Sequence, residues 1–284
     1  MFYQKEKTKI ENIGVLFSFY ILFVLRFILI IFPNYFFDYN KNGWCIYSIG
    51  TYLFTLILIY FERKRLIDFK IDKISLSIIV FLKPLEPIIL ALVYKMDSQL
   101  SLSNIGGKVL VGISLLFLPV YLKIMKGMNT SNKQLSPLLI GFILGFICLI
   151  IKSFFQLGST INMSIENGFS SLLSLSAIYE VFYQMSYAAI SEEPFFRGFV
   201  WGYLEKLKLN TIVIVFIQIV LFTLGHLFYF KNNPISFFVY VPLTTLFLCI
   251  GIIVTKKLSA SIVTHSIVNS LSPPINIIMN GLVK

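Results

Sequence analysis

The chain has 284 residues, of which 57% are hydrophobic and only 13% are charged, and its mean hydropathy is +0.84. Soluble globular domains are far more polar, so this composition excludes them and indicates an integral membrane protein. The net charge of +11 lies mainly at the ends of apolar stretches, which fits membrane orientation and anionic lipid headgroups better than nucleic acid, so we expect no nucleic-acid partner.

Apolar stretches of about 20 residues, the length of a helical span, recur along the whole chain. The first, 13–32, is too long for a signal peptide and lacks a small-residue cleavage site, so we expect it to be retained. The segments that follow are 44–61, 74–94, 108–124, 136–156, 170–190, 211–230, 235–254 and 259–280. The predicted fold class is all-α, a polytopic transmembrane helical bundle of about 8–9 helices with an intramembrane active-site cavity.

Segment 74–94 gives the weakest signal of these. Its apolar run is interrupted by Lys83, Pro84, Glu86 and Pro87. Charges and prolines at these positions can make a helix broken or re-entrant instead of a straight span, so the sequence leaves open whether this segment crosses the membrane. If this segment does not cross the membrane, every later loop changes side.

Basic residues lie beside every second segment, and this alternation predicts which loops are cytoplasmic. The clusters are Lys5, Lys7 and Lys9; Arg63, Lys64, Arg65, Lys70 and Lys73; Lys123, Lys126 and Lys133; Lys206 and Lys208; and Lys256 and Lys257. The loops between them, such as the one that holds Asp38 and Lys41, carry little positive charge. We therefore predict a multi-pass protein of the cell membrane with a cytoplasmic N-terminus.

Ionisable side chains at membrane depth are unfavourable, by roughly 2.5 to 3.5 kcal/mol each at a helix centre, so those present usually have a function. The glutamates within or against apolar segments are Glu86, Glu180, Glu192 and Glu193. The chain has two histidines, and both His226 and His265 lie in predicted helices. These residues are the first candidates for an active site.

The segment SEEPFFRG, residues 191–198, places two of these carboxylates beside an arginine. Glu193 and Arg197 are four residues apart and face each other on a helix, so we expect Arg197 to neutralise Glu193. Glu192 points about 100° away from its neighbour and is the better candidate base. We expect Pro194 to kink or loosen the helix at the carboxylates.

His265 and Asn269 are also four residues apart, so an imidazole and a carboxamide share one helix face as donors toward a developing negative charge. Structural roles stay open for these candidates. Glu193 and Arg197 can hold two helices together as an ion pair, and an intramembrane histidine can serve as a hydrogen-bonding residue between helices. For Glu180 we favour a supporting or packing role.

Three motifs follow one another in the chain: EEPFFR at 192–197, FTLGH, which ends at His226, and HSIVN, which begins at His265. Their order and spacing resemble the CPBP family of intramembrane proteases, also called the Abi family. Its members include CAAX prenyl proteases and proteins of bacteriocin processing or immunity. The family pattern EExxxR, FxxxH and HxxxN is present without a substitution, and the resemblance covers about residues 176–275.

The resemblance implies a glutamate protease in which Glu192, helped by His226, activates water. It implies that His265 and Asn269 stabilise the oxyanion. The supporting residues are Glu193 and Arg197. A carboxylate in a low-dielectric cavity gains basicity, and fixed donors stabilise a tetrahedral intermediate, so the chemistry agrees. We expect no cofactor and no metal; a zinc site made by His226, His265 and Glu192 is the minority alternative.

The other intramembrane protease types do not fit, because the chain has no HExxH, GxGD or GxSG motif. We find no internal repeat and no dividing linker, so we expect one integrated domain: 1–165 as N-terminal transmembrane helices and 166–284 as a CPBP-like catalytic transmembrane core. We expect buried thiols at Cys45, Cys148 and Cys249, which lie in apolar segments without metal-ligand spacing.

Three classes of function stay open. The first is an intramembrane endopeptidase that cleaves a peptide or a membrane-associated substrate, in bacteriocin or pheromone peptide processing or in immunity. The second is a non-catalytic membrane scaffold or immunity protein with the same fold. The third is an ion-coupled transporter that uses the buried charges as a relay. The expected partners are a peptide or protein substrate and the lipid bilayer, and the sequence does not define an oligomeric state.

Overall fold

The computed structural model describes residues 9–31, 41–92, 100–128, 136–156 and 164–283. Every regular element in these ranges is a helix, and no strand occurs in them. The all-α fold class predicted from the sequence is therefore confirmed. The basic residues Lys5, Lys7 and Lys133 and the acidic Asp38, on which part of the orientation prediction rests, lie outside the described residues.

Within these described ranges, five helices are long and apolar enough to cross a membrane. The stretches are Ile10–Ile28, Gly43–Glu62, Ile105–Gly127, Ser136–Phe154 and Ser236–Thr255. Each coincides with a segment predicted from the sequence. These helices identify the chain as a multi-pass membrane protein.

The other four predicted segments are helical, but they are interrupted or rich in polar residues. They contain α4 (Lys73–Ser77), η1 (Ile78–Leu82) and α5 (Lys83–Leu92); α8 (Ile165–Leu172), α9 (Leu175–Tyr187) and η2 (Ala188–Glu192); α11 (Thr211–Leu224) and α12 (Tyr229–Asn232); and α14 (Leu258–Val283). Ser174 breaks the segment 170–190, because its side chain accepts the Ala177 N–H and caps α9.

The charges that interrupt segment 74–94 are paired inside the protein. Lys83 Nζ lies 2.6 Å from Glu86 Oε2, and both side chains are buried. Pro87 lies inside α5. A helix that begins with a buried ion pair and holds a proline differs from a uniform apolar span, as the sequence indicated.

The chain divides into two compact units. The first comprises Met1–Asp68 and Lys83–Met128. Its helices are α1 (Lys9–Ile31), α3 (Lys41–Glu62), α5 and α6 (Ile105–Gly127). In this unit α1 packs along α3, where the rings of Phe17 and Phe54 meet edge to face at 5.9 Å.

The second unit comprises Phe69–Leu82 and Asn129–Lys284 and contains all three motifs. Besides the helices already given, it holds α7 (Ser136–Phe154), η3 (Pro194–Val200), α10 (Trp201–Lys206), η4 (Ser236–Tyr240) and α13 (Val241–Thr255). Its hydrophobic core lies between α7 and α14 and includes Cys148, Leu149, Val263, Ile267, Val268 and Leu271. Cys148 and Cys249 are buried free thiols, whereas Cys45 in the first unit is half-buried.

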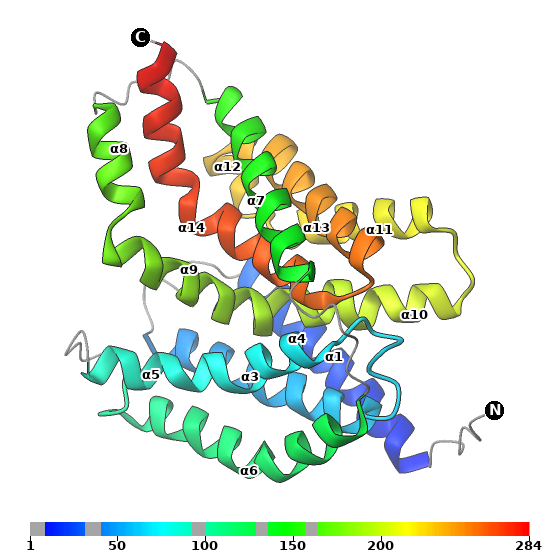
Figure 1. Ribbon diagram of the computed structural model, residues 1–284. Coiled ribbons are helices and arrows are strands. Elements are labelled where there is room, and N and C mark those ends of the chain that lie inside the picture. Colours follow the sequence, from blue (N-terminus) through cyan, green and yellow to red (C-terminus); the bar gives the residue numbers. More distant parts are fainter. Residues whose placement is uncertain (1–8, 32–40, 93–99, 129–135, 157–163, 284) are drawn as a thin grey trace. The chain divides into compact units, whose positions relative to one another are not determined.

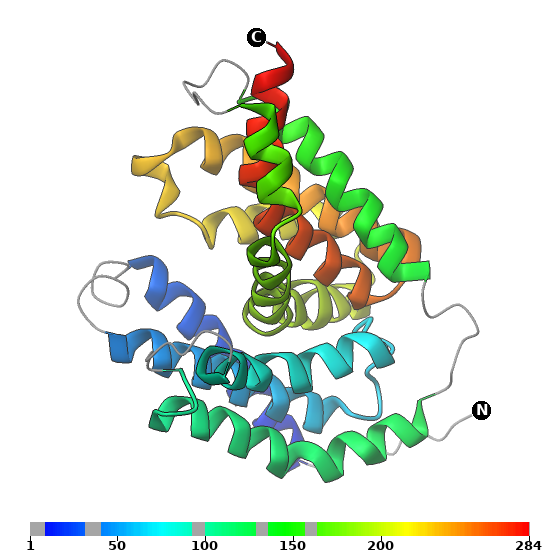
Figure 2. The same cartoon turned by 60° about the vertical axis from the view of Figure 1, so that its left-hand side comes forward.

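Helix α7 runs alongside α14 (Figures 1 and 2), and two glycines allow the close approach. A Cβ on Gly141 would lie 2.5 Å from the Ala260 carbonyl oxygen, and one on Gly145 would lie 2.8 Å from the Ile267 side chain. Thr264 Oγ1 donates to the Gly141 carbonyl at 3.0 Å. Small residues spaced by four are typical of tight helix packing in membranes.

A short segment before α4 fixes the start of α14. The Leu258 N–H donates to the Lys70 carbonyl at 2.6 Å, and the Ser259 N–H donates to Asp72 Oδ1 at 3.1 Å. The other carboxylate oxygen of Asp72 accepts the Ile74 N–H at 3.3 Å, so Asp72 caps α4 as well. The N-terminal turns of α14, which lead to His265, are therefore anchored within this unit.

Candidate active site

The first motif lies where its helix widens. Glu193 lies between two π-helical segments, η2 and η3. Pro194 has no N–H to donate to the carbonyl four residues earlier, and the Glu193 N–H donates to the Ala188 carbonyl, five residues earlier. The helix is thus loosened at Pro194, as expected from the sequence. Such π-helical turns are frequent at functional sites.

Glu193 is fully buried and accepts hydrogen bonds from three side chains. Arg197 Nη1 donates to Oε1 at 3.1 Å, and His265 Nδ1 donates to the same oxygen at 2.8 Å. Ser261 Oγ donates to Oε2 at 2.5 Å. The expected pairing of Glu193 with Arg197 is present, and Glu193 also holds the motif on α14 against η3.

Glu192 lies on the other side of the same imidazole. Its side chain is 2% exposed, and its Oε2 is 3.5 Å from His265 Nε2. Because Nδ1 carries the hydrogen donated to Glu193, Nε2 of a neutral ring presents a lone pair to Glu192. Two lone pairs at this distance repel, so the contact is favourable only when one proton lies on Nε2 or on Glu192. His265 thus links the two adjacent carboxylates.

Phe222, the aromatic residue of the second motif, packs against the charged centre of the site. The guanidinium carbon of Arg197 lies 4.0 Å from the centre of its ring, which is a cation–π contact. The ring also lies 5.9 Å from the His265 imidazole and 4.6 Å from that of His226. Phe222 therefore places the two histidines of the chain on one aromatic side chain.

His226 lies in a turn, not within a helix as the sequence predicted. Helix α11 ends at Leu224, and Gly225 and His226 begin the turn that leads to α12. Gly225 is the C-cap of α11, and its N–H donates to the Leu221 carbonyl. His226 Nδ1 contacts the Phe222 carbonyl at 2.8 Å, and because a carbonyl oxygen only accepts, Nδ1 carries the hydrogen. The lone pair of the neutral ring is then on Nε2.

Asn269 is exposed on α14, and its amide is held from α9. Asn269 Nδ2 donates to Gln184 Oε1 at 3.2 Å, and Gln184 Nε2 donates to Glu180 Oε1 at 2.7 Å. Glu180 is therefore connected to Asn269 of the third motif through the side chain of Gln184. The Asn269 amide has a second hydrogen, which Gln184 does not use.

Sequence reasoning missed three residues of this arrangement, namely Ser261, Gln184 and Gln218. Gln218 is buried, and its Nε2 donates to the Phe196 carbonyl within η3 at 2.8 Å. A spacing of four was the available signal for each, because Ser261 precedes His265 by four residues, as Gln218 precedes Phe222 and Gln184 follows Glu180.

In the ranges that the structure describes, no three side chains of His, Cys, Asp and Glu gather as a metal site would require. The nitrogen of His265 that donates to Glu193 is not a free ligand position, since a coordinating nitrogen needs its lone pair. A zinc site formed by His226, His265 and Glu192 would use Nε2 of His265, the atom that faces Glu192.

Residues 174–271 match the family model described as type II CAAX prenyl endopeptidase Rce1-like. This region is Rce1-like. It contains all three motifs, and the family resemblance seen in the sequence is thereby confirmed. No curated protein and no solved structure matches the chain. At the level of the family, the Rce1-like region indicates a membrane-embedded protease of the CAAX type, a hydrolase with peptide or protein substrates.

Proposed function

We propose that the protein is an intramembrane endopeptidase of the glutamate type, with Glu192 as the general base. The observation that carries this proposal is the position of His265, whose two ring nitrogens face Glu193 and Glu192. Glu193 already accepts hydrogen bonds from Arg197 and Ser261, so Glu192 is the carboxylate that is left to accept a proton from water. The family match supports the reaction class.

The charges of the site favour this assignment. With Arg197 and His265 protonated and both glutamates ionised, the four buried residues sum to zero, and a neutral cluster is the least costly in a low-dielectric site. Glu192 then accepts a proton from water, and the resulting hydroxide attacks the peptide carbonyl carbon. Glu192 returns this proton to the leaving amine when the C–N bond breaks.

The oxyanion and the water have their own proposed partners. The Nε2–H of protonated His265 and the second amide hydrogen of Asn269 donate to the oxyanion. The lone pair on His226 Nε2 accepts a hydrogen bond from the water and orients it toward the carbonyl. Phe222 positions His226 through its ring contact and through its carbonyl, which holds Nδ1.

For the substrate, we propose a peptide or the end of a membrane-associated protein, such as a bacteriocin or pheromone precursor. This choice is motivated by the CPBP family, which the motifs resemble and which includes proteins of bacteriocin processing. The runner-up is a membrane scaffold or immunity protein that binds without cleavage. An ion-coupled transporter that uses the buried charges is the third alternative.

A cleavage assay on the purified full-length protein tests the proposal. The protein in detergent is incubated with a mixed peptide library, and new termini are identified by mass spectrometry. We expect defined cleavage sites that vanish in the variant His265→Ala, whose folding is checked by its unfolding temperature. Absence of cleavage together with proton-coupled solute uptake in vesicles contradicts the protease assignment and favours transport.

The same assay distinguishes the proposed metal-independent mechanism from the metal-dependent alternative. We expect turnover to persist in orthophenanthroline, because the proposed base is a carboxylate that acts on water directly. Loss of cleavage that stoichiometric zinc restores would instead assign His226, His265 and Glu192 as ligands.

A further inference from the structure

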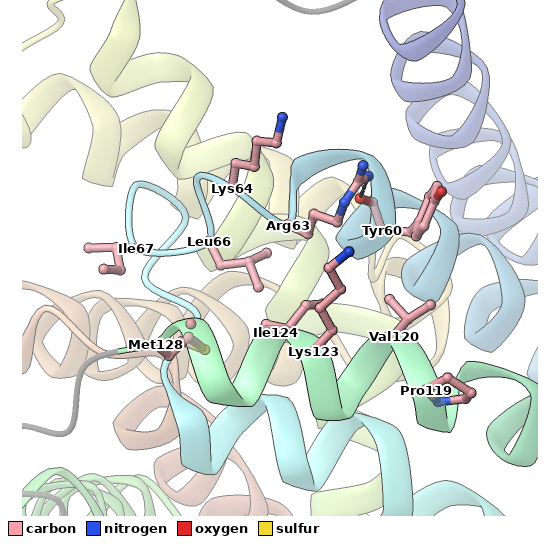
Figure 3. Close-up of a pocket in the computed structure, with 11 residues that line it drawn as sticks. Tyr60, Arg63, Lys64, Leu66, Ile67, Pro119, Val120, Lys123, Ile124 and Met128 are labelled. Atoms are coloured by element: carbon pink, nitrogen blue, oxygen red, sulfur yellow. Dashed lines mark hydrogen bonds between the residues drawn. The ribbon is translucent and has the colours of Figure 1, made fainter. Parts of the chain in front are cut away.

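A pocket of about 780 Å³ lies in the first unit, between α6 and the turn that follows α3 (Figure 3). Pockets of roughly 300 to 1,000 Å³ are typical of sites for small ligands. Its wall combines the cationic residues Arg63, Lys64 and Lys123 with apolar residues that include Leu66, Ile67 and Ile124. None of its lining residues belongs to the three motifs.

The charge of the pocket is positive. Among the residues that the structure describes, no carboxylate lines it. Arg63 is partly balanced by Glu11, at 3.7 Å from its Nη2, but within the described part of the chain the structure pairs neither Lys64 nor Lys123 with a carboxylate. Both lysines are exposed. An anionic ligand would supply the missing countercharge.

Arg63 is held in a fixed orientation before any ligand arrives. Its Nη1 donates to the Tyr60 carbonyl at 2.6 Å, and its guanidinium carbon lies 4.4 Å from the centre of the Tyr60 ring. In Figure 3 the Lys123 side chain extends from α6 toward the turn that carries Arg63. A preorganised guanidinium beside a flexible lysine suits a phosphate group.

The apolar part of the wall and its place in the fold point to a lipid. Leu66 and Ile124 are buried, whereas Ile67 is 72% exposed at the rim. The pocket lies at the ends of two candidate membrane spans, since Gly43–Glu62 and Ile105–Gly127 both end beside it. Lipid headgroups lie at that level, and basic pockets between transmembrane helices bind anionic headgroups.

We propose that this pocket binds an anionic phospholipid. The phosphate of the lipid lies among Arg63, Lys64 and Lys123. The part of the acyl chains next to the headgroup covers the aliphatic rim of the pocket at Ile67. A free phosphate ion satisfies the same cations but gains nothing from the apolar wall, which is why a lipid is the better fit.

Binding of a fluorescent phosphatidylglycerol to the full-length protein in a neutral detergent tests this assignment. The double variant Lys64→Gln/Lys123→Gln removes two charges from the pocket. The matched control Lys108→Gln/Lys126→Gln removes two exposed charges from α6 that do not line it. At about 1 kcal/mol per cation near a headgroup, we expect the pocket variant to bind on the order of thirty-fold more weakly and the control less than about three-fold.

Competition identifies the source of the phosphate. Unlabelled phosphatidylglycerol should displace the probe, while phosphatidylcholine and millimolar inorganic phosphate should not. Equal losses in both double variants, or displacement by phosphatidylcholine as effective as by phosphatidylglycerol, overturn the proposal. Displacement by inorganic phosphate at matched concentration overturns the lipid in favour of a soluble anion. If the double variant does not fold, the single variants Lys64→Gln and Lys123→Gln are each expected to weaken binding about five-fold.

Discussion

Glu193 is a buried carboxylate whose three donors come from residues on two different elements. Arg197 is supplied by the same helix, whereas His265 and Ser261 come from α14. A buried charge is tolerated only when it is paired and hydrogen-bonded. If one partner is removed, the desolvation penalty of the remaining buried charge is no longer compensated. This dependence gives the first prediction.

We expect Glu193→Gln and Arg197→Gln each to lower the free energy of unfolding, by about 3 to 5 kcal/mol if the pair is fully desolvated. The double variant should be less destabilised than the two losses added together, because neither charge is then left alone. Thermal unfolding in detergent, followed for the wild type and the three variants, measures both effects. Strict additivity would show that the two side chains do not act as a pair.

Spacing along one helix was the part of the site that the sequence revealed. Glu193 with Arg197, and His265 with Asn269, were found because residues four apart share a helix face. Contacts between elements were not visible, since no local pattern tells that His265 reaches Glu193 or that Asn269 reaches Gln184. These contacts depend on how α14 packs, which is a property of the folded unit.

Two features position the N-terminal half of helix α14. Asp72 accepts a hydrogen bond from its first turn, and its residues from Ala260 to Ile267 pack against Gly141 and Gly145 of α7. The position of His265 therefore depends on residues that carry no chemistry themselves. A substitution on the face of α7 that packs against α14 should therefore displace His265, although the substituted residue does not contact the site.

We expect Gly141→Leu to destabilise the protein by about 1 to 3 kcal/mol, because its side chain would meet the backbone of α14 at Ala260. Peptide cleavage should fall with it, since His265 lies on the displaced helix. Gly112→Leu is the matched control, because a Cβ at Gly112 in α6 meets no atom within 4 Å. Equal unfolding temperatures for the two variants would contradict the close packing.

The boundaries of helices were less predictable than their existence. Segments 170–190 and 211–230 read as continuous spans, but Ser174 caps a new helix in the first, and α11 stops at Leu224 in the second. Serine and glycine occur often within membrane helices, so these residues gave no decisive stop signal. The boundary matters for the proposed function, because His226, which we propose to orient the water, lies in the turn after α11.

For the molecule as a whole, apolar length and composition predicted the membrane class and, within the described residues, the five helices that are long and apolar enough to cross a membrane. They did not separate α14 from these spans, because α14 is also long, with 26 residues. Its buried face is rich in serine and threonine and carries His265, which lowers its hydropathy. A helix that carries a polar site therefore reads as a weaker span than a helix that only crosses.

The basic loops predict a cytoplasmic N-terminus and cytoplasmic turns near Arg65, Lys126, Lys206 and Lys256. The experiment uses a background in which the native cysteines are replaced by serine, with single cysteines introduced at these turns. The native cysteines are Cys45, Cys148 and Cys249. An impermeant thiol reagent should fail to label the introduced cysteines in intact cells and should label them after lysis. Ready labelling at position 126 or 206 in intact cells would reverse the orientation.

The assignment of Glu192 as base is tested most directly by the cleavage rate of Glu192→Gln, measured beside Glu193→Gln on a peptide that the wild type cuts. Glutamine keeps the shape but cannot accept the proton, so we expect a loss of at least about a hundred-fold with an almost unchanged unfolding temperature. Glu193→Gln should lose stability as well as activity. If Glu192→Gln cleaves at the wild-type rate while Glu193→Gln is folded and inactive, the two carboxylates have the opposite roles; if both cleave normally, the site does not perform the proposed reaction.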